Sequence, residues 1–178
     1  MKSLLIAGCA ALLAFAAPAQ VNGSINRNAP TVMHSITMGD NKLEVSYTAI
    51  RFGQGQWQQI LDNVDSHERF NEMAMKRPIG SVKSSVPVMA AGKMVPAGEY
   101  SMYFTVHEGA GWVLNLKPAE GEAIRWRLVL QPSGHENECM RINLDPSAEN
   151  GACMLSIAFG EQMVSVPVKV RAEGEKNG

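Results

Sequence analysis

The chain has few of the residues that form disulfides, bind metals or anchor a protein in a membrane. Its 178 residues include three cysteines and four histidines, and aromatic residues make up 6% of them. No long apolar run follows the N-terminal segment, so we expect no membrane span. The formal charge of −1 is not concentrated in one block, which argues against nucleic acid and anionic membranes as partners. No nucleotide, nucleophile or zinc motif is present, so no cofactor is expected.

The N-terminal sequence gives the clearest indication of where the protein is located. Lys2, an apolar run from Leu4 to Ala17 and the small residues around Pro18 are typical of a secretory signal peptide over residues 1–19. We therefore expect an exported bacterial protein, periplasmic or extracellular, whose mature form begins near Gln20. Lipidation of Cys9 as a lipoprotein is a minor alternative, because the apolar run continues past Cys9 and a lipobox leaves too short an apolar region before it.

The remainder of the chain has the size of one domain. Residues 20–31 are rich in asparagine and residues 171–178 are charged and contain glycine. We expect the first to be a flexible N-terminal segment and the second a disordered tail. Residues 32–170 are long enough to bury a core without disulfides or metals.

Apolar and polar residues alternate with a period of two along most of 32–170, which predicts β-strands. The clearest pair is 100–106 and 112–116, joined by a glycine-containing turn as in a hairpin. The last segment has valine at every second position, with Pro167 on the opposite face, as an edge strand permits. Strands are predicted at 32–38, 42–49, 100–106, 112–116, 123–130, 139–144, 152–159 and 163–170.

The period changes between residues 56 and 75. There Trp57, Ile60 and Val64 follow helical spacing, and no proline occurs before Pro78. One short helical insert near 56–75 is expected. The fold class predicted from both periods is an all-β antiparallel β-sandwich of about eight or nine strands carrying this insert.

Cys139 and Cys153 are the cysteines that remain after signal-peptide cleavage, and export would favour their pairing. Side-chain alternation places Cys139 on a polar face and Cys153 on an apolar face. Matching the apolar faces in a hairpin sets Ile142 opposite Cys153, which separates the two thiols. A Cys139–Cys153 disulfide is therefore possible but less expected than free thiols.

The best candidate cluster of polar residues is Arg51, Asn71 and Glu72, and Trp57 lies near Arg51 in the sequence. A guanidinium and a carboxylate beside a tryptophan are suited to bind a small polar ligand. Alternatively, the same groups form an internal salt bridge that attaches the helical insert to the sheet. We favour this structural role.

Acidic residues and a histidine also gather within the insert, at Asp62, Asp65, His67 and Glu68. They fail the calcium-loop spacing and lack the paired-histidine zinc pattern, so a solvated helix face is expected and no metal site is assigned.

A turn and hairpin, Gly92–Ser101 followed by Trp112–Asn115, resemble those of an exported bacterial family catalogued as domain of unknown function 2911. The resemblance covers most of 32–170 and implies an exported domain of unassigned biochemical role. The chain departs from the family pattern at 66–70 and 73–74, where a polar site would lie. Further matches are Tyr47, Arg51 and Gly53 ahead of Trp57, the Asn71–Glu72 pair and the valine-rich last strand.

We expect a non-catalytic binding or structural module of the bacterial envelope, which contacts an unknown small polar ligand or an envelope protein. One alternative is a small hydrolase or isomerase that uses Glu72 with Arg51, which requires a buried carboxylate in a pocket. A periplasmic metal carrier is a second alternative, suggested by the abundant methionines.

Overall fold

The computed structural model describes residues 29–170, apart from 52, 54 and 55. The predicted signal peptide, most of the segment 20–31 and the tail 171–178 lie outside the described residues. The helical elements are Gln56–Asp62 (α1), Val64–Ser66 (the 3-10 turn η1) and His67–Lys76 (α2). The strands are Thr31–Met38 (β1), Asn41–Thr48 (β2), Gly80–Ser84 (β3), Val88–Ala90 (β4), Lys93–Val95 (β5), Gly98–His107 (β6), Gly111–Pro118 (β7), Ile124–Arg127 (β8), Gln131–Pro146 (β9) and Ala152–Val170 (β10).

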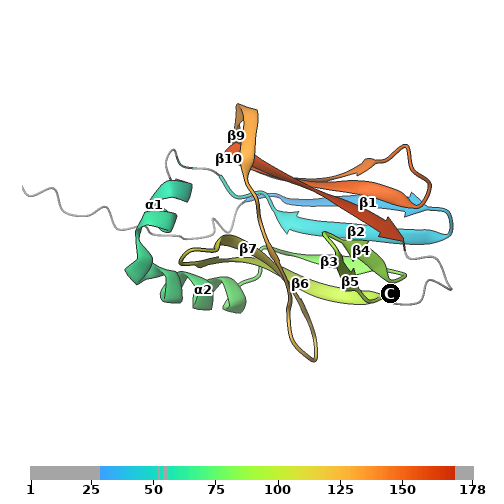
Figure 1. Cartoon of the computed structure of the whole chain (residues 1–178), viewed down its shortest axis with the longest axis horizontal. Helices are drawn as coiled ribbons and strands as arrows, with labels where there is room; N and C mark the ends of the chain where they lie inside the picture. The colour runs from blue at the N-terminus through green and yellow to red at the C-terminus, as the bar shows by residue number, and fades with distance from the viewer. Residues whose placement is uncertain (1–28, 52, 54–55, 171–178) are drawn as a thin grey trace, which may run out of the picture.

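These strands form two antiparallel sheets, and the predicted β-sandwich is confirmed (Figure 1). One sheet has the order β1-β2-β3-β6-β7-β8 and the other the order β5-β4-β10-β9. The described residues hold ten strands rather than eight or nine. The short strands β3, β4 and β5 were not separated in the sequence, and the two predicted strands 152–159 and 163–170 are one continuous strand, β10.

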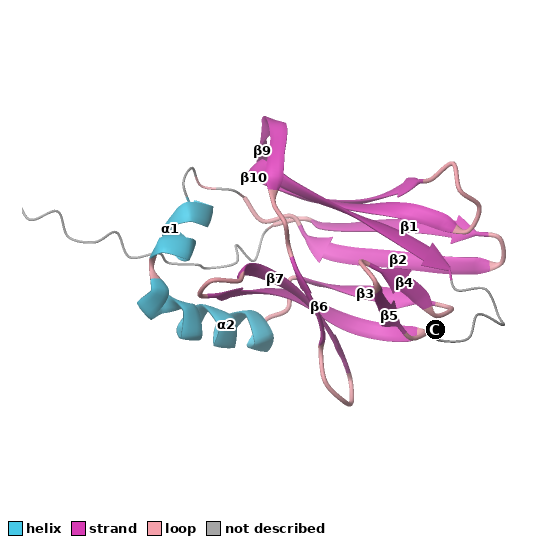
Figure 2. Cartoon of the chain, in the orientation of Figure 1, coloured by secondary structure: helices cyan, strands magenta, loops and turns pink. Residues whose placement is uncertain are grey.

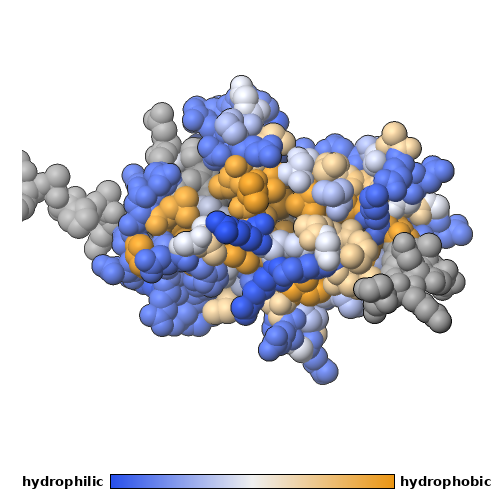
Figure 3. All heavy atoms as spheres, in the orientation of Figure 1, coloured by the Kyte–Doolittle hydropathy of each residue, from blue (hydrophilic) through white to orange (hydrophobic). Residues whose placement is uncertain are grey.

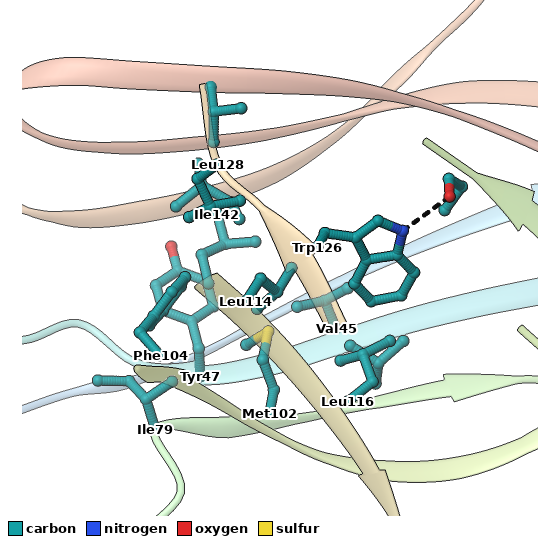
Figure 4. Close-up of a cluster of buried hydrophobic side chains, with 14 of the residues drawn as sticks. Val45, Tyr47, Ile79, Met102, Phe104, Leu114, Leu116, Trp126, Leu128 and Ile142 are labelled. Atoms are coloured by element: carbon teal, nitrogen blue, oxygen red, sulfur yellow. Dashed lines mark hydrogen bonds between the residues drawn. The ribbon is translucent and has the colours of Figure 1, made fainter. Parts of the chain in front are cut away.

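The core lies between the sheets and contains the predicted apolar faces, but β6 and β7 do not show the predicted single buried side, because both of their faces are buried over residues 102–106 and 112–116. Tyr100, Met102 and Val106 of β6 are buried, and Met102 and Ile142 have 0% of their surface exposed. Figure 4 shows Met102 and Ile142 among the buried side chains that meet across the interior. Burial of one such side chain contributes about 1.5–3 kcal/mol, so the two apolar faces hold the sandwich together. A void of about 40 Å³ remains among apolar side chains near Val82 and Trp126.

The two sheets are tied together along both sides. On one side the chain leaving β2 bridges to β9, where the Met140 amide donates to the Ile50 carbonyl over 2.8 Å. On the other side the Trp126 indole N–H of β8 donates to the Ala90 carbonyl of β4 over 2.8 Å, the dashed line in Figure 4. The first contact covers part of the edge of β9 that would otherwise expose unpaired backbone groups.

The predicted position of Pro167 on an edge strand is wrong. β10 lies between β4 and β9, and it pairs with β9 up to Met163 and with β4 from Val168 onward. Pro167 falls in the interval between these two ladders, where a missing N–H costs no ladder hydrogen bond. The proline is therefore tolerated because this stretch of β10 pairs with neither neighbouring strand.

The helical insert is confirmed at residues 56–76, but the helix is interrupted within it. Asn63 leaves helical geometry at φ −94° and ψ 74°. Its carbonyl accepts hydrogen bonds from the amide and the hydroxyl of Ser66, which start the next helical segment. Two short α-helices joined by a 3-10 turn result, and Figure 2 shows them gathered at one end of the sandwich.

Candidate functional site

Helix α2 presents two different faces. His67, Phe70, Asn71 and Ala74 are buried or half-buried and follow i, i+3, i+4, i+7 spacing, so they lie on one face. Glu68, Glu72 and Met75 are exposed and lie together on another face. The first face attaches the insert to the sandwich, and the second borders the candidate site.

The side chain of Asn71 forms hydrogen bonds with the edge of β6 at a point that the neighbouring strand does not reach. The ladder between β3 and β6 ends at Gly80 and Met102, so β3 does not reach Val106. There the Asn71 side-chain amide donates to the Val106 carbonyl, and the Val106 amide donates to Asn71 Oδ1, each over 2.8 Å. A side-chain amide offers the same donor and acceptor as a backbone peptide unit. Asn71 thus satisfies the open edge of β6 and docks α2 on it.

His67 and Phe70 complete the attachment. The ring Nε2 of His67 lies 2.8 Å from the Ile60 carbonyl, so this nitrogen donates and ties α2 to the end of α1. Phe70 packs edge-on against Trp112, with ring centroids 5.6 Å apart. His67 lies on a different face from the exposed Glu68, and only 7% of its surface is exposed. It lies on the face that Phe70 and Asn71 share.

An open groove of about 490 Å³ lies between α2 and the turn that joins β6 to β7. Its carboxylates come from α2 and from the turn, whereas its apolar walls come from η1, α2 and β6. A salt bridge of 3.1 Å joins Glu72 to Lys76 one helical turn later, with 54% and 73% of the two side chains exposed. The groove is lined by Val64, His67, Glu68, Asn71, Glu72, Met75, Val106, His107 and Glu108.

The structure brings together two of the four predicted site residues. Asn71 and Glu72 both line the groove. Arg51 is exposed and bridges by its backbone to Cys139 of β9, and Glu72 pairs with Lys76 rather than with Arg51. The predicted Arg51–Glu72 salt bridge is therefore wrong. Trp57 lies in α1, and its side chain falls outside the described part of the structure.

Sequence reasoning missed several residues of the groove. His107 ends β6, and its Nε2 lies 3.1 Å from the Thr105 hydroxyl. Glu108 was not singled out, and Met75 was considered only among the methionines of the metal-carrier alternative. A helical projection of 67–76 gives the signal for the α2 residues, since it separates the face of Phe70 from the face of Glu72. No local signal places the β6–β7 turn beside them.

Cys139 and Cys153 are free thiols, but the predicted register is wrong. Cys153 lies opposite Pro146, and Ile142 lies opposite Ile157. Alternation fixes register only to within an even shift, because a shift by two residues keeps every side chain on its face. Burial raises the pKa of the Cys153 thiol, which keeps it protonated.

Within the described residues, no three or more histidine, cysteine, aspartate or glutamate side chains are placed to share a metal ion. Nor is any helix in this part of the chain long and apolar enough to cross a membrane.

No family model, no curated protein and no solved structure matches the chain. The resemblance to domain of unknown function 2911 stays a prediction, and the candidate site stands on its geometry alone.

Proposed function

We propose that this chain is an exported, non-catalytic binding module of the bacterial envelope, and that it contacts a protein partner through its helical end. The observation that carries the proposal is the distribution of exposed apolar side chains. Five large hydrophobic side chains of the described residues are exposed: Met33, Val64, Met73, Met75 and Val129. Three of these belong to the insert, and two of the three, Val64 and Met75, line the groove. Exposed apolar side chains gathered beside a groove are typical of interaction surfaces.

The hydropathy of the surface supports the same region. Figure 3 shows hydrophobic residues among hydrophilic ones over the helices. Methionine is enriched at protein interfaces, and its flexible side chain adapts to a partner. Carboxylates of Glu68, Glu72 and Glu108 border the groove and would form the polar rim of such an interface.

The geometry gives less support to the enzyme alternative. A catalytic acid or base beside Arg51 requires a buried carboxylate, whereas 54% of the Glu72 side chain is exposed and its partner is Lys76. Asn71, the other conspicuous polar group, is committed to the β6 backbone through both of its amide atoms. Both groups have structural partners that a binding module can retain.

Site-specific photocrosslinking in the producing cells tests the proposal. A photoreactive amino acid at position 75 reports on the groove, and one at Lys83, exposed on β3, is the matched control. We expect a discrete protein adduct from position 75 and none from position 83. Adducts from both positions alike, or from neither, would contradict the proposal. Cell fractionation and N-terminal sequencing of the same material test export and a mature start near Gln20.

A further inference from the structure

We propose that strand β1 is the interface of a symmetric dimer, in which the free edge of β1 pairs antiparallel with the same edge of a second copy of this chain. The inference goes beyond the proposed function, because β1 contributes no residue to the groove at the helical end. It is carried by three features of this strand: its outward backbone groups, its lack of the protection that the other sheet edges have, and the apolar side chains at its margin.

The free edge of β1 carries a regular row of backbone donors and acceptors. Within the described part of the chain, β1 pairs with β2 alone, through eight consecutive residue pairs. The Ala49 N–H donates to the Pro30 carbonyl over 2.9 Å, in the same register as these pairs. Peptide groups alternate in direction along an antiparallel pair, so the even-numbered residues of β1 direct theirs toward β2. The odd-numbered residues direct theirs outward, and they are Thr31, Met33, Ser35 and Thr37.

The four edge strands of the two sheets, β1, β8, β5 and β9, differ in their protection. Natural edge strands are usually short, or carry charges, prolines or bulges that hinder pairing with another chain. β8 has four residues, two of them exposed arginines, and β5 has three residues and begins at Lys93. β9 contains Pro132 and shifts register against β10. β1 has eight residues without an acidic residue, lysine, arginine, proline or bulge, so it is the edge best suited to accept another strand.

Apolar side chains at the margin of β1 match a second copy of the same strand. Val32 and Ile36 lie opposite buried residues of β2 and pack against the core, yet both are only half-buried, since they lie at the edge of the sheet. A two-fold axis perpendicular to the sheet makes the two β1 strands antiparallel. With this axis at His34, Val32 of one copy lies opposite Ile36 of the other, and all outward peptide groups over residues 31–37 find partners. The two apolar side chains then cover each other.

The same pairing brings no like charges together. The charged residues of the neighbouring strand, Lys42 and Glu44, already form a salt bridge of 2.8 Å. On the outer face of β1, Met33 is 67% exposed and lies opposite Ser35 of the second copy. Backbone hydrogen bonds carry the association, as in β-strand addition. The extended sheet then ends in the two copies of β8, whose exposed arginines oppose further growth beyond a dimer.

Sedimentation velocity of the mature protein, from about 1 to about 200 μM, tests the dimer. One strand pair is a small interface, so we expect a reversible dimer with a dissociation constant of about 1–100 μM and no larger species. Met33→Lys/Ser35→Lys sets like charges opposite each other and should weaken association at least about tenfold. The matched control, Ser101→Lys/Ser165→Lys, adds the same charges at exposed positions of β6 and β10 and should associate as the parent does.

Charge reversal fixes the location of the interface. Met33→Glu/Ser35→Glu should also associate more weakly than the parent, because carboxylates repel each other as ammonium groups do. Mixed in equal amounts, the lysine and glutamate variants should form a heterodimer at least as tight as the parent dimer, since opposite charges then face each other. Both substituted side chains are exposed, and recovery in the mixture also shows that the two variants are folded.

Each contrary outcome overturns the inference. A parent that stays monomeric at every concentration would leave the free edge of β1 to a strand of another protein. A dimer that the lysine variant leaves intact would place the interface elsewhere, and equal weakening in the control would show non-specific repulsion. Failure of the mixture to recover would contradict antiparallel pairing of β1 with itself. None of these results changes the photocrosslinking expected from position 75, so the proposed function stands or fails separately.

Discussion

The sheets and the helical insert of this chain are held in different ways. The sheets meet through apolar side chains, several of which are wholly excluded from water, such as Met102 and Ile142. By contrast, α2 has a single buried side chain, His67, whose hydrogen bond joins it to α1. The attachment of α2 to the sandwich consists of the two hydrogen bonds of Asn71 and the packing of the half-buried Phe70 against Trp112. Apolar burial supplies most of the stability of a fold, whereas each hydrogen bond adds about 1 kcal/mol.

This difference means that the outer face of the insert does not stabilise the sandwich. Glu68, Glu72 and Met75 pack against no other layer and remain exposed. They can change without a large loss of fold stability, and they are available to a partner. The following four changes test the contrast between the two regions, from the largest expected effect to the smallest.

Substitution within the core should be severe. Trp126→Ala removes a side chain that is 6% exposed and the hydrogen bond that ties β8 to β4. We expect the free energy of unfolding to fall by about 3–5 kcal/mol, measured by urea denaturation. Trp126→Phe is the control, because it keeps most of the packing and loses mainly the hydrogen bond. A small loss for the alanine variant would show that apolar burial at β8 does not hold the sheets together.

Substitution of the docking amide should act locally. Asn71→Ala leaves the Val106 N–H and C=O without a partner, at a cost of about 2 kcal/mol for opening of the insert. Trypsin cleavage after the exposed Arg69 and Lys76 should then become about 30-fold faster, while the urea midpoint moves little. Asn71→Asp keeps an acceptor for the Val106 N–H, so its cleavage rate should lie between those of the parent and the alanine variant. Unchanged proteolysis would mean that Asn71 does not hold the insert.

Filling the void between the sheets should stabilise the core slightly. Val82→Ile adds one methylene beside the void of about 40 Å³. At about 24 cal/mol per Å³ of cavity, the upper limit of the gain is about 1 kcal/mol. Val164→Ile is the matched control, since Val164 is buried away from the void and should be overpacked by the same change. Stabilisation by both substitutions would contradict the position assigned to the void.

Alkaline pH should weaken the sheets gradually. Burial raises the pKa of the Cys153 thiol and of the Tyr100 hydroxyl. The folded state therefore holds these protons more tightly, so stability is fully present below the unfolded pKa values of about 8.5 and 10 and is lost as the pH rises beyond them. Cys153→Ala should flatten the decline that begins near pH 8.5, measured by urea denaturation at successive pH values. An equally steep decline in that variant would rule out the thiol as its source.

The sequence predicts which side chains of a strand face the core better than it predicts which strands pair with one another. Alternation correctly places Val45, Met102 and Val168 in the core, because side-chain direction depends only on position along one strand. It cannot choose between registers that differ by an even shift, as Cys153 opposite Pro146 shows. It also cannot show that β10 is flanked on both sides, since pairing is set by the whole sheet.

The candidate site is partly readable from the sequence. Helical spacing puts Asn71 with Phe70 and apart from Glu72, which already separates a docking residue from an exposed one. The role of Asn71 as a substitute strand depends on where β3 ends relative to Val106, and this is a tertiary property. The same holds for Arg51, whose distance from Glu72 is decided by the bridge to β9.

Native-state hydrogen exchange of the mature chain tests most directly whether the helical end is a separately docked unit on a sandwich held by apolar burial. We expect the amides of residues 58–76 to exchange through a local opening, with a free energy well below that of β6 and β10, and Asn71→Ala to lower only the former. Equal exchange free energies in the insert and in both strands, lowered together by that substitution, would contradict this description.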